Sequence, residues 1–349
     1  MRQRRFRTGQ RGVAVITALL LTTLAITIVA SLFWQQQVQV RSIENQRLQL
    51  QKQWILRGAL DYARLVLRED ARTSNIDHLG EPWAVPLEET RLDQYVDDNR
   101  ADGEASDATL SGNIVDAQSR LNLTNLCVGG AIDPVQVEAF ARLLSSLSLP
   151  PNLAQAAANM MQTAQKAGGQ TQAAAAVAAQ GASVVAAQAN AAPLAPTTAA
   201  TTETTGALPT AGGGTSEPLG LTQRDDLLAV PGFTPEIVAK LKDYVVVLPT
   251  VTPVNVNTAS PQVLSAIVGT LPLSDAYGLV ARRTFYNSVA DFASNVPGQA
   301  VNPSDPKLSV ATGYFLVNGK VRLSRAALDV QSLIQRNGMN TAVVWTRQN

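Results

Sequence analysis

The sequence predicts an α+β protein in which a long N-terminal transmembrane helix packs on an antiparallel sheet, with a large α-helical domain inserted into that sheet. Three observations predict this class. An uncharged apolar run extends from Val13 to Phe33, and strong helix formers continue it to Asp70. Alternating apolar and polar residues, typical of strands, occur between Thr109 and Leu126 and again after Pro306. Helical spacing prevails over much of the chain between these strand regions.

The apolar run is long enough to cross a membrane. As a helix, its 21 residues would span about 30 Å, which matches the hydrocarbon core of a bilayer. Five arginines and no acidic residue precede it, so the charge predicts a cytoplasmic N-terminus and an exported remainder. A cleaved secretory signal peptide is the alternative. Its apolar core usually has about 7–15 residues, whereas this run is longer and polar helix formers follow it from Gln35 onward.

The helix is expected to continue beyond the membrane as a stalk. From Trp34 to Asp70 the chain contains no proline and a single glycine. Its distal half carries an apolar stripe with three- and four-residue spacing, formed by Leu56, Ala59, Leu60, Ala63, Val66 and Leu67. Such a stripe requires a partner surface. We expect this surface to be a sheet, and membrane-surface binding is the alternative.

The region from Thr73 to Gly103 is predicted to be mostly loop. It holds a set of acids, with one more just beyond it: Asp77, Glu81, Glu88, Glu89, Asp93, Asp97, Asp98 and Glu104. These oxygens could suit calcium, but the alternating carboxylates and turn glycine of an EF-hand loop are missing. Solvated surface charge is therefore the preferred interpretation. Trp83 is expected to anchor this loop on the helix.

The segment from Thr109 to Leu126 predicts a strand, a turn, and a second short strand or helix start. Asp116, Arg120 and Asn122 could suggest catalysis, but no base or metal partner accompanies them. We expect hydrogen bonding at turns and strand edges instead. Cys127 is the single cysteine, so an internal disulfide is excluded. It is predicted to be a small buried hydrophobic residue. With one histidine, His78, a zinc site with several His or Cys ligands is excluded as well.

Helical patterning returns after Asp133, a candidate N-cap. One helix is expected to end near Ser148, and a second is expected from Asn152 to Lys166. From Ala167 to Ser216 the only charged residue is Glu203, and this Ala/Thr-rich stretch has too little apolar bulk to form a core. Its run of three glycines lacks the lysine of a phosphate-binding loop. A flexible insertion is the expected structure.

The segment from Leu221 to Ala293 contains the strongest signal for a different function. Asp226 to Glu236 predicts a helix, a tight Pro-Gly turn and a helix from Pro235, and Val256 to Pro261 repeats the theme. This pattern resembles a helix-hairpin-helix, which is widespread in DNA-binding proteins. Five basic residues face six acidic ones in this segment, so it lacks the excess of positive charge that phosphate neutralisation requires. A small helical interaction module is preferred.

The C-terminal region switches to the alternation of strands. Asn318-Gly319, inside Tyr314 to Leu323, is a hairpin signal, although one continuous strand with a bulge is also possible. A strand around Leu328 to Ile334, a turn at Asn337-Gly338 and a last strand from Ala342 to Trp345 follow. These strands are expected to complete the sheet that begins near Ile114.

Two stretches carry a resemblance to a known family. The basic leader ending at Gly12, followed by Val13 and an apolar helix, resembles the prepilin-type leader of type IV pilins and pseudopilins. Thr17 departs from that pattern, because most members carry Glu at the fifth residue after the cut. This departure resembles the minor pseudopilin K family of type II secretion. Gly112 to Leu126 also resembles a stretch common in that family, Gly-x-Ile-x-Asp-x-Gln leading into Asn-Leu-Asn.

The resemblance implies a pilin-like fold with several parts. They are a leader at 1–12, a transmembrane helix at 13–33, its continuation at 34–70 and the first part of an α+β domain at 71–126. An inserted helical domain at 127–305 contains the low-complexity linker 167–216 and the helix-hairpin-helix-like part 221–293. Strands at 306–349 complete the sheet. The acidic segment that binds calcium in many relatives has no counterpart between Ala154 and Gly181, so no cofactor is carried over.

The resemblance also implies a structural role without catalytic residues. A prepilin peptidase would cut between Gly12 and Val13, and the absence of Glu at Thr17 goes with a place at the tip of the pseudopilus. The implied partners are minor pseudopilins I and J, the major pseudopilin and the inner-membrane assembly platform. The implied location is the bacterial inner membrane, with a single pass, a cytoplasmic N-terminus and a periplasmic C-terminal domain. Tip assembly would start the fibre and support export of folded proteins.

Two other classes of function compete with this one. A membrane-anchored DNA receptor of a competence-type system would use Leu221 to Ala293, but nucleic acid is not expected as a partner on the charge count above. For an exported hydrolase, neither a Gly-x-Ser-x-Gly nucleophile elbow nor a zinc motif occurs in the sequence, and a triad of residues scattered along the chain stays open as an alternative.

Overall fold

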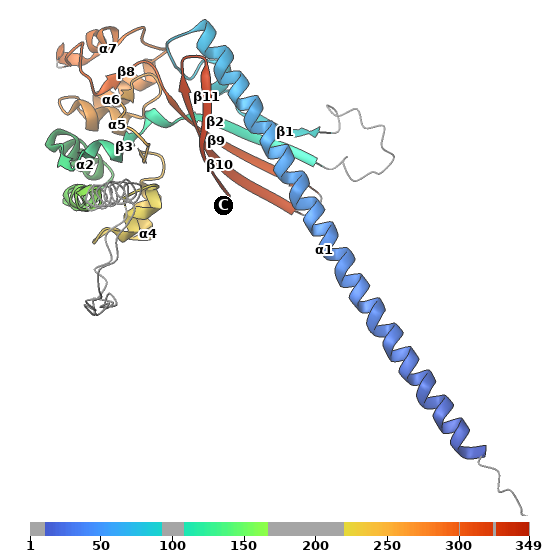
Figure 1. Cartoon of the computed structure of the whole chain (residues 1–349). Helices are drawn as coiled ribbons and strands as arrows, with labels where there is room; N and C mark the ends of the chain where they lie inside the picture. Colours follow the sequence, from blue (N-terminus) through green and yellow to red (C-terminus); the bar gives the residue numbers. More distant parts are fainter. Residues whose placement is uncertain (1–10, 93–107, 167–219, 300, 324–325, 349) are drawn as a thin grey trace, which may run out of the picture.

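The computed structural model describes residues 11–92, 108–166, 220–299, 301–323 and 326–348. It confirms the α+β class: one long N-terminal helix, an antiparallel sheet and a set of shorter helices (Figure 1). The predicted linker 167–216 lies outside the described residues.

The N-terminal helix, α1, runs without interruption from Arg11 to Thr73, over 63 residues. The expected membrane segment and stalk are therefore one element. From Val15 onward it includes a stretch that is long and apolar enough to cross a bilayer, judged by length and composition. Its N-terminal half projects away from the rest of the protein, and its C-terminal half lies against the sheet (Figure 1).

The main sheet has five antiparallel strands in the order β1-β2-β9-β10-β11. The strands are β1 (Leu87–Arg91), β2 (Ala108–Asp116), β9 (Tyr314–Leu323), β10 (Ala326–Asn337) and β11 (Asn340–Gln348). Since β2 and β9 are neighbours, the chain between them forms an insertion into the sheet, as expected.

Each face of the sheet carries its own apolar core. On one face, Ala63 and Leu67 of α1 pack with Phe315, Ile334 and the fully buried Trp83, which is 1% exposed. Trp83 belongs to a short 3₁₀ helix, η1 (Pro82–Ala84), and anchors its loop on α1 as predicted. On the other face, Leu316 and Leu333 pack with Val246 and Leu248 of the insertion.

The insertion is built from short helices around a third and larger core. Its α-helices are α2 (Pro134–Ser146), residues 153–166, α4 (Pro235–Lys240), α5 (Pro261–Val268), α6 (Leu273–Arg282) and α7 (Val289–Asn295). The 3₁₀ helices are η4 (Ala117–Ser119), η5 (Leu123–Leu126), η6 (Arg224–Ala229) and η7 (Pro297–Gln299). Asp133 caps α2 by accepting hydrogen bonds from the backbone amides of Val135 and Gln136, which confirms the predicted start of this helix.

Short strand pairs join segments of the insertion that are far apart in sequence. The parallel pairs are β3 (Leu121–Asn122) with β6 (Val245–Val246) and β7 (Val254–Asn255) with β8 (Leu308–Ser309). The antiparallel pair is β4 (Cys127–Val128) with β5 (Ala131–Ile132). Asn122 continues this connection, since its side chain donates to the carbonyl of Thr250 and accepts from the amide of Leu248. The hydrogen-bonding role predicted for Asn122 is confirmed.

The hairpin signal at Asn318-Gly319 was misleading, because β9 passes straight through it. Its pairing with β2 and with β10 is unbroken, without a bulge. A turn needs backbone groups free from the ladder on one side, whereas β9 is paired on both sides. The side chain of Asn318 donates to Asn113 and accepts from Gln331, its neighbours on the flanking strands. The turn at Asn337-Gly338 is confirmed, with a φ of 55° at Gly338.

Two further expectations need correction. β1 lies in a region that was predicted to be mostly loop, and its polar sequence Leu-Glu-Glu-Thr-Arg explains the missed signal. The segment before the Pro-Gly turn is the 3₁₀ helix η6 rather than an α-helix. An edge strand and a 3₁₀ turn both depend on tertiary packing more than on local propensity.

The cross-strand pair Gly112–Gly319 allows a matched test of the sheet. A Cβ added at Gly112 would lie 2.5 Å from the carbonyl oxygen of Asn318, whereas one at Gly319 would lie 3.7 Å from Leu56 Cδ1, an ordinary contact. We expect Gly112→Ala to lower the free energy of unfolding by about 1–3 kcal/mol, and Gly319→Ala to have little effect. Thermal unfolding of the full chain in detergent would measure both. Equal losses in the two variants would contradict the register.

Candidate functional site

The residues predicted to mark processing lie at the start of α1. Gly12 and Val13 fall within its first turn, since the helix begins at Arg11. The side chains of residues 11–14 lie outside the described part. Thr17 follows about one turn later and is exposed. These residues share one helix end, and their proposed roles remain predictions.

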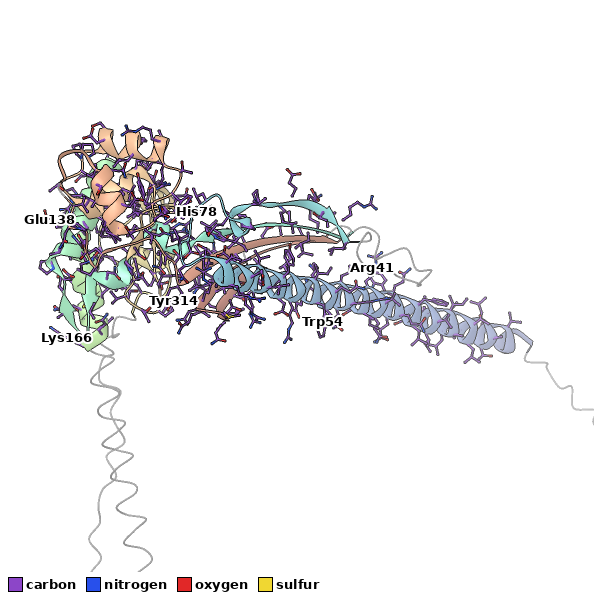
Figure 2. All side chains as sticks on the ribbon, turned by 90° about the horizontal axis from the view of Figure 1, so that it is seen from above. Arg41, Trp54, His78, Glu138, Lys166 and Tyr314 are labelled. Atoms are coloured by element: carbon purple, nitrogen blue, oxygen red, sulfur yellow. The ribbon has the colours of Figure 1, made fainter. Side chains whose placement is uncertain are left out.

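Beyond the membrane segment, α1 exposes a row of four large apolar residues. Ile43, Leu50, Trp54 and Leu65 are 63%, 58%, 69% and 54% exposed. Their spacings are close to multiples of about 3.6 residues, which places them along one side of the helix. The sheet-facing residues, such as Leu67, occupy a different side and are buried. The stalk thus buries one apolar side against the sheet, and its exposed surface carries these apolar residues among charged ones such as Asp61 and Arg68; Figure 2 shows the side chains along the helix.

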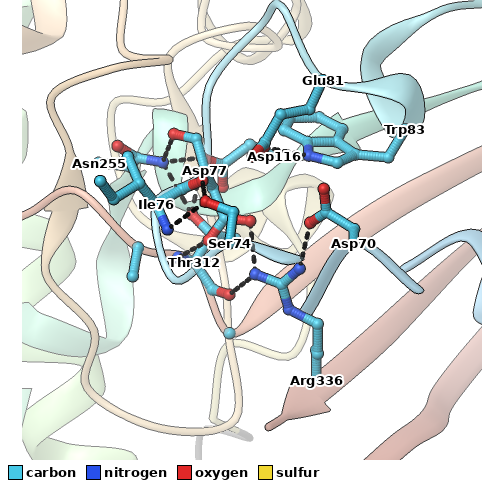
Figure 3. Close-up of polar contacts among 12 residues, drawn as sticks. Asp70, Ser74, Ile76, Asp77, Glu81, Trp83, Asp116, Asn255, Thr312 and Arg336 are labelled. Atoms are coloured by element: carbon cyan, nitrogen blue, oxygen red, sulfur yellow. Dashed lines mark hydrogen bonds and ion pairs between the residues drawn. The ribbon is translucent and has the colours of Figure 1, made fainter. Parts of the chain in front are cut away.

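At the other end of α1, a buried polar cluster joins the helix, the sheet and the insertion (Figure 3). We call it the polar junction, and it comprises Asp70, Asp77, Glu81, Asp116, Asn255, Thr258, Thr312 and Arg336. Its cation is Arg336 of β10, whose side chain is 7% exposed. The Arg336 guanidinium donates from Nη1 to Asp70 Oδ2 at 2.7 Å and from Nη2 to Asp77 Oδ1. Nη2 also donates to the carbonyl of Thr312. One side chain therefore fixes three segments.

Asp116, at the end of β2, connects the sheet to the insertion. Its Oδ2 accepts hydrogen bonds from Asn255 Nδ2 at 2.9 Å, Thr258 Oγ1 at 2.5 Å and Thr312 Oγ1 at 2.7 Å. Its Oδ1 accepts from the backbone amide of Gln118, closing a turn. The turn role predicted for Asp116 is confirmed. Its contacts with Asn255 and Thr258, distant in sequence, are additional. Arg120 lies nearby, and its Nη2 is 3.8 Å from Asp243.

Asn255 and Asp77 complete the connection. Asn255 Nδ2 also donates to the carbonyl of Asp77, and Asp77 Oδ2 accepts from the amide of Thr312 at 2.6 Å. Glu81 Oε2 accepts from Trp83 Nε1 at 2.7 Å and from the amide of His78. The His78 ring stacks on Phe285 of the insertion at 4.4 Å between centroids. Through Glu81, the polar junction thus reaches Trp83, which packs in the core between α1 and the sheet.

Burial dominates the electrostatics of these carboxyls. Desolvation and, second to it, the charge of Glu81 raise the pKa of Asp70 to about 6, against the hydrogen bond and charge of Arg336. Desolvation also raises the pKa of Asp77, against the charge of Arg336. Desolvation raises the pKa of Asp116 to about 6, although hydrogen bonds from Thr258, Thr312 and Gln118 favour its charged form. The junction holds more acid than base.

The acids Asp70, Asp77 and Glu81 have oxygens within 4.8 Å of one another, a spacing that could suit a metal ion. Arg336 already supplies positive charge to two of them, so the arrangement is that of a buried ion-pair network. The prediction of solvated acids is therefore wrong for Asp77 and Glu81, which are 1% and 7% exposed. It holds for the exposed Glu88 and Glu89. The acids at 93, 97, 98 and 104 lie outside the described residues.

Sequence reasoning missed Asp70, Arg336, Asn255 and Thr312 as a group. One signal was available: Arg336 alternates in phase with the apolar residues Val330 and Ile334, both buried. An arginine on the core side of a strand requires a buried partner. The partners of Arg336 lie far from it in the sequence, so the local sequence pattern could not identify them.

Of the two hairpin-like turns, the repeated one lies in the protein core, whereas Pro231 and Gly232 of the first are exposed. Gly232 of the Pro-Gly turn has a φ of +95°, and a Cβ placed there would lie 2.7 Å from Leu153 Cδ2. In the repeated turn, Asn257 is buried and binds the backbone of Tyr286 through both polar atoms of its side chain. The repeated turn is therefore covered by protein, which does not favour phosphate contacts there. Cys127 is fully buried, as predicted, with Sγ 3.4 Å from Gln165 Oε1.

Replacing Arg336 tests whether the junction is structural. Arg336→Met would leave the Asp70 and Asp77 carboxyls buried without their cation, so we expect a loss of about 3–5 kcal/mol in the free energy of unfolding. The matched control is Arg322→Met, because Arg322 is 59% exposed and pairs with Glu89 at 3.5 Å. Its loss should be at most about 1 kcal/mol. Chemical denaturation would measure both variants. Asp70→Asn combined with Arg336→Met should recover part of the loss, and similar losses for the two arginine variants would contradict this role.

Comparison with known proteins places the chain in a family. Residues 119–250 and residues 254–311 match two family models, both described as type II secretion system (T2SS), protein K, and together they cover more than half of the chain. A curated relative from Pseudomonas aeruginosa, the type II secretion system protein K, is 35% identical over 156 residues, which are 43% of this chain and 43% of the relative. The match thus spans less than half of that relative's length.

A solved structure shows the same fold. It is the crystal structure of the GspK-GspI-GspJ complex from the type 2 secretion system of enterotoxigenic Escherichia coli. The matched chain has a TM-score of 0.59 and 19% sequence identity, over 88% of this chain and 99% of that chain. Together with the two family models, these matches show that the chain belongs to the type II secretion system protein K family.

Proposed function

We propose that this protein is a minor pseudopilin at the tip of the type II secretion pseudopilus, where it starts fibre assembly and supports export of folded proteins across the outer membrane. The observation that carries this proposal is the position of the insertion. In both views it lies at the end of α1 farthest from the N-terminus, beside and beyond the sheet (Figures 1 and 2). A subunit with this bulk at its outer end suits a terminal place in a fibre.

The proposed partners follow from the family and from α1. The GspK-GspI-GspJ complex suggests that minor pseudopilins I and J assemble with this chain. The exposed row of Ile43, Leu50, Trp54 and Leu65 offers a surface for parallel helices anchored in the same membrane. The major pseudopilin below the tip, the prepilin peptidase and the inner-membrane assembly platform complete the proposed set.

We further propose a single-pass location in the inner membrane, with the N-terminus in the cytoplasm and the folded domain in the periplasm. The arginines before the apolar run support this orientation. The proposed mechanism is assembly rather than catalysis, and the buried carboxyls are bonded to structural partners. DNA binding is not favoured, because Leu221 to Ala293 carries five basic and six acidic residues, and the turn around Asn257 is buried. The division into leader, helix, split α+β domain and inserted domain is part of this proposal.

Processing is tested by co-expression with a prepilin peptidase followed by N-terminal sequencing. We expect Val13 as the new N-terminus, and Gly12→Leu should abolish the cut because the peptidase would no longer meet glycine before the apolar helix. Gly9→Leu is the matched control, since Gly9 lies in the same leader, and it should be cut normally. A cut at another position, or equal effects of the two glycine changes, would overturn the proposed processing site.

The tip position is tested by restoring a carboxylate in the membrane segment. Thr17→Glu would supply the charge that, in relatives, pairs with the N-terminal ammonium of an adjacent subunit, so labelled protein should appear along fibres instead of only at one end. Thr22→Glu makes the same chemical change one to two turns further along α1 and should not redistribute the protein, because an unpaired buried carboxylate is costly. Immuno-electron microscopy of fibres would measure this. Equal labelling of wild type and Thr17→Glu along the shaft would refute the tip assignment.

A further inference from the structure

The polar junction carries an imbalance of charge. Asp70, Asp77 and Glu81 approach within 4.8 Å, and Asp116 is joined to Asp77 through Asn255 and Thr312. With every group ionised, four carboxylates would share two guanidinium groups, that of Arg336, which pairs with Asp70 and Asp77, and that of Arg120, which interacts with Asp116. Burying unpaired charge costs several kcal/mol per ion. Neighbouring carboxyls reduce this cost by binding protons that they share.

The titratable and charged groups of the junction come from four places. Asp70 comes from α1; Asp77, His78 and Glu81 come from the loop after it; Asp116 and the nearby Arg120 come from the end of β2; and Arg336 comes from β10. The insertion and the strand-entry segment contribute neutral groups to the described contacts: Asn255, Thr258 and Thr312. At this point the insertion is therefore attached by neutral side chains that donate hydrogen bonds to Asp116, a group that titrates.

The geometry allows a proton to bind without disruption. Thr258 and Thr312 both place a hydroxyl on Asp116 Oδ2. A hydroxyl can donate to a carboxylate or accept from a carboxylic acid, so a protonated Asp116 can donate to one of them with no change of position. At Asp70, the guanidinium can only donate, and a protonated Asp70 still offers an acceptor oxygen to it.

We propose that the polar junction is a pH-responsive clamp, which holds the insertion on α1 and the sheet most tightly when it carries a bound proton and loosens when that proton is lost. The attachment weakens because the released proton leaves like charges buried together. The clamp is independent of the proposed role at the tip. It concerns how two parts of this chain are held together.

The sign follows from the raised pKa values of Asp70 and Asp116. Both rise from 3.8 to about 6 in the folded protein, so between these values the folded state binds more protons than the unfolded state. Stability from these groups is complete below pH 3.8 and is lost as the pH rises through about 6. Between the unfolded and folded pKa values, a rise of one pH unit changes the folding equilibrium about tenfold, so each group contributes up to about 100-fold.

Hydrogen–deuterium exchange on the full chain in detergent micelles tests the clamp directly. Protection of residues 254–260 and 308–313 is measured at pH 5, 6 and 7 and corrected for intrinsic exchange. In the wild type, we expect protection of both segments to fall by about tenfold or more from pH 5 to pH 7. The exposed carboxyl Asp329, which pairs with Lys320 on the sheet, provides the control, and Asp329→Asn should behave like the wild type.

Asp116→Asn should remove about half of this pH dependence, since an amide does not titrate in this range whereas Asp70 still does. Asp70→Asn is the second variant, which keeps the test decisive if Asp116→Asn does not fold, and it should reduce the dependence in the same direction. Protection that is constant or rises with pH in the wild type would overturn the proposal. A wild-type pH dependence that persists undiminished in a folded Asp116→Asn or Asp70→Asn variant would also overturn it.

Discussion

The structure depends on the position of one guanidinium. Arg336 reaches from the end of β10 to Asp70 of α1, to Asp77 of the following loop and to the carbonyl of Thr312. Because a buried charge is stable only when it is paired, these segments cannot shift independently. The connection continues through Thr312 and Asn255 to Asp116. The end of the membrane-anchored helix, the sheet and the insertion therefore share one polar network.

This network holds together segments that are far apart in the chain. The pairing of β2 with β9 joins segments separated by the whole insertion, and such non-local contacts form slowly because a long loop must close first. The parallel pairs β3–β6 and β7–β8 and the bonds of Asn122 reduce this problem, since they join both ends of the insertion to its central segment, which contains β6 and β7. The apolar contact of Val246 and Leu248 with Leu316 and Leu333 seals the same boundary.

The exposed surfaces of the sheet and the helix suit different kinds of association. Both edge strands are irregular, with register shifts in β1 between Leu87 and Thr90 and in the β10–β11 pair between Leu333 and Ile334. Bulged edges discourage pairing with further strands. In contrast, the exposed surface of α1 beyond the membrane segment includes large apolar residues such as Trp54 and Leu65. Assembly through parallel helices is consistent with this distribution.

The sequence by itself determined the elements whose signal is local. The apolar run, the continuous helix, the strand alternation around Ile114 and Ile334 and the cap at Asp133 all follow from spacing and propensity. Tertiary structure decided the rest. Asn318-Gly319 forms no turn because strands on both sides hold it, and Asp77 and Glu81 are buried because Arg336 and Trp83 bind them. Partners that are more than 200 residues apart, as Asp77 and Arg336 are, leave no local pattern, since their contact exists only once the sheet has closed.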